Sequence, residues 1–255
     1  MTCEHNINNA NNTNGVFTLM ADTDNDNEKN MAIDKRMHSG SVNLDDLLGG
    51  GFEHGIITQI YGASGTGKTN ICMSLAVECI RTGERVVIID TDGFSAERFS
   101  QIAGSDAREL AKDLIIYEPA DFQQQYSAIT DVEKLAGTGI GLIIVDSATL
   151  FYRMGLVPDD DGNVHIRRQL VEMLAGLHRL ARKFNMVVVI TNQVYTDVES
   201  GELQPLGGNL SEHLSKTIIK MERAGRDKRR ATLIKHRSRA EGQSVELTIS
   251  DKGVE

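Results

Sequence analysis

Eight consecutive residues of the chain have the types and the spacing of a phosphate-binding loop. They are Gly62, Ala63, Ser64, Gly65, Thr66, Gly67, Lys68 and Thr69, and they fit the pattern G-x-x-x-x-G-K-[ST]. Glycines let the backbone N–H groups of such a loop point at phosphate oxygens, while the lysine reaches the β- and γ-phosphates and the last hydroxyl ligates magnesium. An apolar run precedes the loop and a helical pattern follows it, which is the context that the motif requires. The pattern therefore predicts a site for a nucleoside triphosphate, namely ATP with Mg2+.

A carboxylate further along the chain is suited to the same site. Asp146 ends a run of four apolar residues, Leu142 to Val145, about eighty positions beyond the loop. A buried parallel strand would place Asp146 at its carboxyl end, beside the loop, where it can hold magnesium through water. An apolar strand that ends in Asp is a common pattern by itself, and the loop makes it specific. We therefore expect Thr69 and Asp146 to be the metal ligands.

Two more polar side chains follow predicted strands. Asp92 comes just after Ile88-Ile-Asp90, where its carboxylate could orient the attacking water, and Gln193 comes just after Val189, where its amide could sense the γ-phosphate. Taken singly, each is more typical of an ordinary loop residue. Because ligands bind open α/β sheets at the carboxyl ends of the strands, Lys68, Asp92 and Gln193 become the candidate catalytic residues.

These side chains need a sheet that brings strand ends together, and the sequence predicts one. Ile- and Val-rich runs at 56–61, 85–90, 114–117, 142–146 and 186–191 are typical of parallel strands that are buried on both faces. Helical stretches at 69–81, 95–103, 121–135 and 164–184 alternate with them, with Asp121 as a cap and Gly83 ending the first helix. Runs at 217–221, 231–235 and 245–249 follow without long helices between them. The predicted fold class is α/β: a mostly parallel central sheet with helices on both faces and an antiparallel C-terminal extension.

The composition divides the chain at about residue 36. Residues 1–36 are rich in Asn and Asp and have little apolar periodicity, which predicts a disordered extension. Residues 37–255 contain no Pro/Gly/Ser-rich linker and no repeat, which predicts one domain. No apolar run reaches the roughly 18 residues of a membrane helix, no secretory leader is recognisable, and the three cysteines lack metal-ligand spacing. We expect a cytoplasmic protein without a membrane partner.

The charge is unevenly distributed. The formal net charge is −9, yet residues 216–239 contain ten Lys or Arg against Glu222 and Asp227, a local surplus of eight positive charges. Fields at a surface follow local charge, so this segment is a candidate contact for an anionic partner such as DNA. A solvated charged face or a subunit interface is an equally good interpretation of the same residues.

The order of these motifs resembles the RecA-type recombinases, most closely their archaeal and eukaryal branch. The resemblance covers roughly residues 37–255 and rests on the loop, on the segments that begin at Asp90, Val145 and Thr191, and on Gly207-Gly-Asn209. Leu233-Ile-Lys-His-Arg-Ser238 and the lack of a helical DNA-binding domain ahead of the core make the chain most similar to the RadB family of short archaeal paralogues. The resemblance implies a RecA-type P-loop ATPase core, ATP binding, DNA binding and a role in homologous recombination and DNA repair.

The resemblance also implies roles for three further residues. Arg98 matches the position that packs on adenine, although an ordinary solvated helix arginine is as good an interpretation. Lys235 and Arg237 match the position whose cations reach ATP bound to the next subunit, and a basic strand facing DNA or solvent is nearly as good. All three are included among the candidate nucleotide-binding residues.

The chain also departs from the family pattern. Asp92 stands where the family usually has Glu, and an acid that is one methylene shorter predicts slow turnover, because misplacement by about 1 Å can cost about a hundredfold in rate. The first DNA-contacting loop contains Pro158-Asp-Asp-Asp161, and the second, residues 194–205, contains three acids and no Lys or Arg. Carboxylates there would repel phosphate, which counts against strand exchange by these loops.

The sequence therefore predicts a weakly hydrolysing, DNA-binding accessory protein of recombination. We expect it to regulate the main archaeal recombinase rather than to exchange strands itself, with DNA contacting the 216–239 segment. Two alternatives stay open: a full strand-exchange recombinase, and a KaiC-like ATPase switch that acts through protein partners only. Self-association and contacts with other recombination proteins also stay open.

Overall fold

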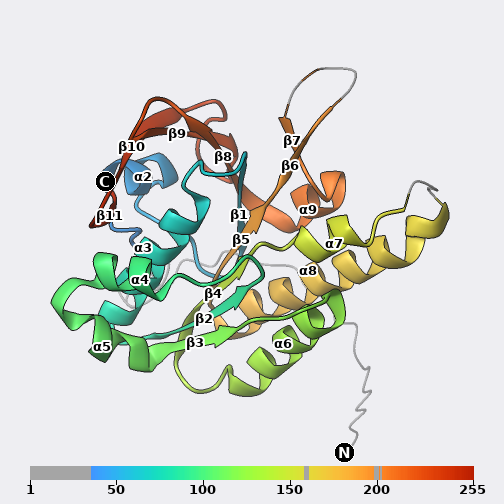
Figure 1. Cartoon of the computed structure of the whole chain (residues 1–255), viewed down its shortest axis with the longest axis horizontal. Coiled ribbons are helices and arrows are strands. Elements are labelled where there is room, and N and C mark those ends of the chain that lie inside the picture. Colours follow the sequence, from blue (N-terminus) through green and yellow to red (C-terminus); the bar gives the residue numbers. More distant parts are fainter. Residues whose placement is uncertain (1–35, 158–160, 198–200, 202) are drawn as a thin grey trace, which may run out of the picture. The chain divides into compact units, whose positions relative to one another are not determined.

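The computed structural model describes residues 36–157, 161–197, 201 and 203–255. Within them the chain forms a nine-stranded sheet in the order β11-β10-β9-β8-β1-β5-β4-β2-β3 (Figure 1). The six strands from β8 to β3 run parallel, and β8, β9, β10 and β11 are antiparallel to one another, as predicted. The bounds are β1 Ile57–Gly62, β2 Arg85–Asp90, β3 Leu114–Tyr117, β4 Ile140–Asp146, β5 Val187–Asn192, β8 Ser215–Arg223, β9 Lys228–Lys235, β10 Ser244–Ser250 and β11 Gly253–Val254.

The central strands form because their residues are apolar on both faces. Along β4, Leu142 and Ile144 contribute to one hydrophobic cluster, while Ile143 and Val145 contribute to the other. Strands β2 and β5 alternate in the same way, since successive side chains of a strand point to opposite faces. A sheet that is buried on both faces needs helices on both faces, and this is what fixes the layered architecture.

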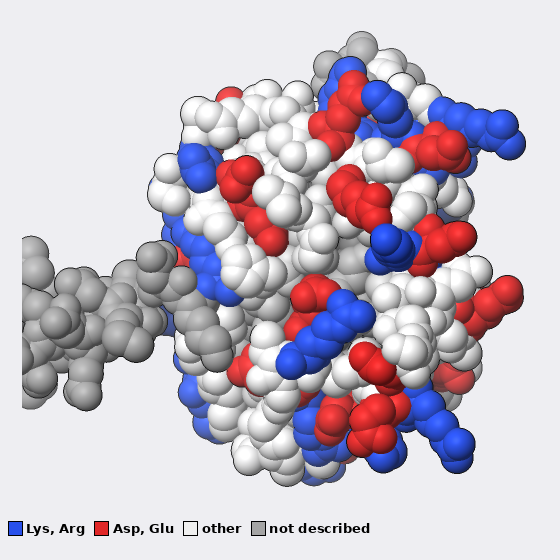
Figure 2. All heavy atoms as spheres, turned by 90° about the vertical axis from the view of Figure 1, so that its left-hand side faces the viewer, with Lys and Arg blue, Asp and Glu red and all other residues white. Residues whose placement is uncertain are grey.

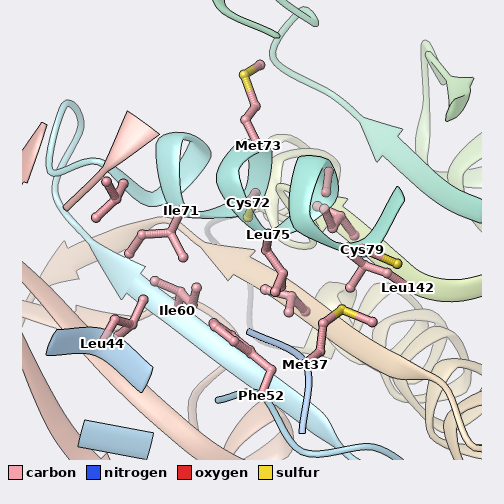
Figure 3. Close-up of a cluster of buried hydrophobic side chains, with 14 of the residues drawn as sticks. Met37, Leu44, Phe52, Ile60, Ile71, Cys72, Met73, Leu75, Cys79 and Leu142 are labelled. Carbon is pink, nitrogen blue, oxygen red and sulfur yellow. The ribbon is translucent and has the colours of Figure 1, made fainter. Parts of the chain in front are cut away.

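Three long helices supply most of those layers. Helix α3 (Lys68–Arg81) packs on one face, where Ile71, Leu75 and Cys79 lie over the strand that carries Ile60 (Figure 3). Helices α6 (Phe122–Leu135) and α8 (Val164–Phe184) cover the opposite face. The Asp121 carboxylate accepts a 2.8 Å hydrogen bond from the backbone N–H of Gln124, which confirms the predicted cap.

Shorter elements escaped the sequence-based assignment. They are α2 (Val42–Leu48), α5 (Ala107–Leu110), α7 (Leu150–Met154) and α9 (Gly208–Leu214), together with the short hairpin of β6 (Val194–Thr196) and β7 (Leu203–Pro205). Helix α4 (Ala96–Ala103) was expected and is capped by Ser95. Elements of three to seven residues give too few periods for a hydrophobic pattern to be recognised.

Several expectations concern residues that the structure does not describe. The predicted disordered extension lies outside the described residues except for Arg36. Cys3, Pro158 and the acidic positions 159, 160, 199 and 202 lie outside them as well. Cys72 and Cys79 are both buried. No helix in the described part of the chain is long and apolar enough to cross a membrane.

Candidate nucleotide-binding site

The predicted phosphate loop joins the end of β1 to the start of α3. Gly67 stands immediately before the helix with a φ of +95°, a left-handed conformation that favours glycine. Gly62 lies so close to the neighbouring strand that a Cβ there would be 2.3 Å from the carbonyl oxygen of Met221. The glycines are therefore required by backbone geometry, and the loop ends at a helix N-terminus, where anions bind readily.

The lysine of the motif lies inside the loop. Lys68 Nζ donates hydrogen bonds to the carbonyl oxygens of Gly62 at 2.9 Å and of Ala63 at 3.1 Å. Burial lowers the pKa of Lys68, and the negative charges of Asp146 and Asp92 oppose that shift. The ammonium group is thus held at the loop by its own backbone, with two carboxylates nearby.

Asp146 is fixed by two hydroxyl groups. Thr69 Oγ1 donates a 2.6 Å hydrogen bond to Asp146 Oδ2, and Thr191 Oγ1 donates a 2.5 Å bond to Asp146 Oδ1. Asp146 is 5% exposed, at the carboxyl end of β4 as predicted. A hydroxyl and a carboxylate oxygen are the hard ligands that Mg2+ prefers, usually with only one or two carboxylates and several waters. The described residues contain no group of three or more His, Cys, Asp or Glu side chains that could hold a metal ion.

Two further carboxylates lie at the carboxyl end of β2: Asp90 is its last residue, and Asp92 comes two residues later. Asp92 lines a cleft that also includes Lys68, Thr69 and Asp146. Burial and the negative charge of Asp146 raise the pKa of Asp92, whereas the positive charge of Lys68 lowers it. Asp90 is buried and accepts a 2.6 Å hydrogen bond from the N–H of Gly93. Burial raises the pKa of Asp90 to about 6 despite that bond. Both acids therefore have a raised pKa, and one of them, Asp92, lines the cleft; shifted pKa values are a common property of functional sites.

Gln193 lies across the cleft from the loop, just after β5. Its backbone N–H donates to Thr149 Oγ1 at 3.2 Å, and its Oε1 accepts a 3.1 Å hydrogen bond from Arg153 Nη1. The cleft has a volume of about 310 Å3, and its walls include Lys68, Thr69, Asp92, Asp146, Arg153 and Gln193. The structure thus brings together every residue that was predicted from strand ends.

Arg98 is held at the edge of this region. Its guanidinium donates to Asn70 Oδ1 at 2.7 Å, to Gln101 Oε1 at 3.0 Å and to the carbonyl oxygen of Ser250 at 2.7 Å. Asn70 itself lines the cleft. Arg98 is therefore a positioned side chain rather than a freely solvated one, and its contact with adenine stays a prediction.

Lys235 and Arg237 do not lie in the cleft. Lys235 is in register with Ile218, which in turn pairs with Gln59, three residues before the loop begins. Lys235 Nζ donates to the carbonyl oxygen of Glu212 at 2.6 Å, and Arg237 forms an ion pair with Glu53. The resemblance assigns these cations to a nucleotide on the next subunit, so their role stays a prediction.

The basic 216–239 segment is less positive than its sequence suggests, because acids from other segments lie against it. Lys228 pairs with Glu246 at 3.0 Å, and within the segment Lys220 pairs with Glu222 at 3.1 Å. On the side of the molecule where β10 and β11 lie, Lys and Arg alternate with Asp and Glu rather than forming a field of one sign (Figure 2). The surplus of eight positive charges is therefore an upper limit on the local charge.

The sequence did not single out Arg153, Asn70 or Thr191 as site residues. Arg153 lies on α7, a helix too short to be recognised from its sequence. Asn70 lies in α3, which was predicted from its apolar pattern alone, and that pattern gives no sign of a polar site residue. Thr191 lies two residues before Gln193, in a segment that carries the resemblance to the recombinases. That segment was the one signal by which Thr191 could have been identified as a site residue.

Comparisons with known proteins agree with this geometry. The Rad51 family model matches residues 32–255. DNA repair and recombination protein RadB of Methanococcoides burtonii is 52% identical over 222 residues, which cover 87% of this chain and 98% of that protein. The RadB proteins of Methanoculleus marisnigri and Archaeoglobus fulgidus are 48% and 47% identical, over 86% and 85% of this chain and 97% and 96% of theirs.

A solved structure agrees as well. The crystal structure of the RadB recombinase superposes with a TM-score of 0.73 at 31% identity, over 86% of this chain and 98% of that one. The chain belongs to the Rad51 family and, within it, to the RadB recombinase paralogues.

Proposed function

We propose that this protein binds MgATP in the cleft at the phosphate loop, hydrolyses it slowly, and serves recombination and repair as a DNA-binding accessory protein. One observation carries the nucleotide part of the proposal: the Thr69 hydroxyl lies 2.6 Å from the Asp146 carboxylate, in a cleft shared with Lys68, Asp92 and Gln193. Residues from four segments of the chain meet there with the ligand chemistry that magnesium and phosphate require.

Each residue has a distinct task in this proposal. The loop N–H groups and Lys68 bind the phosphates, and Thr69 and Asp146 hold the metal, Asp146 through water. Magnesium, when bound, neutralises charge on the phosphate oxygens. Asp92 orients the attacking water and accepts its proton, and its raised pKa makes it a better base near neutral pH. Gln193 senses the terminal phosphate.

We propose slow turnover because of the identity of residue 92. Aspartate stands where the family usually has glutamate, so its carboxylate reaches less far from the backbone. Asp92 lies two residues after the end of β2, and the nearby strand leaves little backbone freedom to make up the difference. The rate should therefore be limited by how well the water is positioned.

We propose that the protein acts on DNA in the cytoplasm, beside the main recombinase. The RadB names of its relatives support a role in recombination and repair. The acidic sequence of both family DNA loops supports an accessory role over strand exchange. A contact with DNA through the 216–239 segment remains part of the proposal. The acids that pair with its lysines weaken the attraction of this segment for DNA phosphates.

An ATPase assay combined with a DNA titration tests this proposal. We expect slow, Mg2+-dependent hydrolysis, DNA binding that weakens as salt rises, and no joint molecules in a strand-exchange assay. Efficient strand exchange would favour a full recombinase, and binding that is absent at low salt would favour a switch that acts on protein partners.

A further inference from the structure

The cleft at the phosphate loop contains a second cation besides Lys68. Among the described residues, the charged side chains of its walls are Lys68, Asp92, Asp146 and Arg153. Lys68 lies on the side of the loop, whereas Arg153 lies on the side of Gln193. A volume of about 310 Å3 is at the small end of the range for ligand sites, so a triphosphate that fills the cleft contacts both sides.

Arg153 is held in place by the contacts of its short helix. Helix α7 begins directly after Thr149, whose Oγ1 accepts a 3.2 Å hydrogen bond from the backbone N–H of Gln193. Just before it, the N–H of Ala148 donates to the carbonyl oxygen of Thr191 at 2.9 Å. Together with the 3.1 Å bond from Arg153 Nη1 to Gln193 Oε1, these contacts tie α7 to the end of β5. The guanidinium is therefore positioned by a strand of the central sheet.

The positive charge of Arg153 is available to an anion in the cleft. Its bond to Gln193 occupies one of its several N–H donors, and no carboxylate among the described residues pairs with it. Arg98 differs, because its guanidinium is already bound to three oxygen acceptors. The one acceptor that Arg153 contacts is a neutral amide, which leaves the charge of its exposed guanidinium uncompensated.

We propose that Arg153 binds the terminal phosphate of ATP from the side of the cleft opposite Lys68. This inference rests on the proposed function and deepens it, because it names a residue that distinguishes a triphosphate from a diphosphate. A guanidinium forms charge-assisted, often bidentate hydrogen bonds with phosphate oxygens. In some nucleoside triphosphatases an arginine of the same subunit stabilises charge on the transferred phosphoryl group. Because Oε1 of Gln193 is turned to Arg153, the amide N–H groups of Gln193 are left to donate to the same phosphate.

The affinities for a triphosphate and a diphosphate, measured in Mg2+, test the inference. The probes are a fluorescent non-hydrolysable ATP analogue and the matching ADP derivative. We expect Arg153→Gln to weaken binding of the ATP analogue roughly five- to tenfold and to leave ADP affinity within about twofold of the parent. Arg108→Gln, at an exposed position on α5 outside the cleft, removes the same charge and should bind both probes like the parent. Arg153 is exposed, so its variant should melt like the parent.

A second comparison separates direct contact with phosphate from an effect that passes through Gln193. In a Gln193→Ala background, Arg153 can no longer act by orienting the amide. We expect Arg153→Gln to weaken binding of the ATP analogue in that background as well, by at least about threefold. Loss of the whole effect in that background would overturn the direct contact, because Arg153 would then act only by positioning Gln193.

Equal affinity of Arg153→Gln and Arg108→Gln for the ATP analogue would also overturn the inference, and so would an equal loss of affinity for the ATP analogue and for ADP. A Lys68→Ala variant in the same experiment separates this failure from a failure of the proposed function. If Lys68→Ala loses affinity while Arg153→Gln does not, only the assignment of Arg153 is wrong. If Lys68→Ala also binds like the parent, the nucleotide site itself is wrong and the inference falls with it.

Discussion

Arg153 Nη1 donates a 3.1 Å hydrogen bond to Oε1 of Gln193. The bond joins α7 to the segment that leaves β5, and both side chains line the cleft that holds Lys68 and Asp146. The proposed sensor of the terminal phosphate is therefore oriented by a cation of α7.

We predict that Arg153→Ala slows ATP turnover by roughly fivefold, because the variant frees the Gln193 amide and removes a cation from the cleft. The side chain is exposed, so the melting temperature should hardly change. A steady-state phosphate-release assay measures the rate. Arg108→Ala on the exposed α5 serves as the control, and a rate equal to that of the control would show that the Arg153–Gln193 bond has no part in turnover.

We predict that Asp92→Glu raises the rate of ATP hydrolysis. The added methylene restores the reach of the carboxylate that the family uses to orient water, and misplacement by about 1 Å can account for about a hundredfold in rate. Single-turnover kinetics isolate the chemical step. Asp106→Glu on the exposed surface is the matched control. A slower or unchanged rate would mean that the length of this side chain does not limit turnover.

We predict that Asp90→Asn stabilises the nucleotide-free protein at neutral pH. The pKa of Asp90 is raised to about 6 by burial, above its unfolded value, so the folded state favours the protonated acid. Its contribution to the free energy of unfolding therefore declines as pH rises from about 4 to about 6, and the penalty is complete above that range. The Asn side chain keeps an oxygen that can accept the N–H of Gly93.

Urea unfolding of both proteins across that pH range measures the effect. The advantage of Asp90→Asn should grow from pH 4 to pH 7 and reach at most about 3 kcal/mol, at 1.36 kcal/mol per pKa unit. Asp113→Asn, at an exposed position, should show no such growth. An advantage for Asp90→Asn that is the same at every pH would indicate that Asp90 titrates at its ordinary value.

We predict that neutralising Arg226, Lys228 and Arg230 together weakens DNA binding for all sequences alike. Each phosphate contact that is lost should also reduce the slope of log affinity against log salt by roughly one. Arg229 is left intact, because its guanidinium donates hydrogen bonds to backbone carbonyl oxygens of the hairpin. Fluorescence anisotropy at several salt concentrations measures the slope, and light scattering follows oligomer mass. A shift in mass with an unchanged DNA isotherm would make this segment a protein interface instead.

Much of the fold was predictable because buried parallel strands have a clear pattern. The run Leu142 to Val145 is apolar throughout, as expected for a strand that is covered on both faces, and β3 and α8 have the predicted bounds. Asp146 and Gln193 were placed correctly for a topological reason: polar residues that follow parallel strands share one edge of the sheet.

The residues that escaped prediction depend on tertiary contacts. Arg153 reaches Gln193 from a five-residue helix, and nothing local to its sequence indicates that contact. Counting charges along the chain also overstated the positive charge of the basic segment. Glu246 and Glu53 lie outside the segment in sequence but form ion pairs with its Lys228 and Arg237. The approach of Arg223 to Gly65 joins residues more than 150 positions apart, and only the register of β8 against β1 reveals it.

Titration of the parent protein and Lys68→Ala with a fluorescent ATP analogue in Mg2+ tests the central claim most directly. Lys68 contacts the loop from within, with hydrogen bonds to the carbonyl oxygens of Gly62 and Ala63. Removing its charge should lower affinity by about 10- to 100-fold, since a charge-assisted hydrogen bond contributes about 1.5–3 kcal/mol. Lys112→Ala, at an exposed position, should bind like the parent. Equal affinity of Lys68→Ala and the parent, with both proteins folded, would contradict the assignment of this cleft to nucleotide.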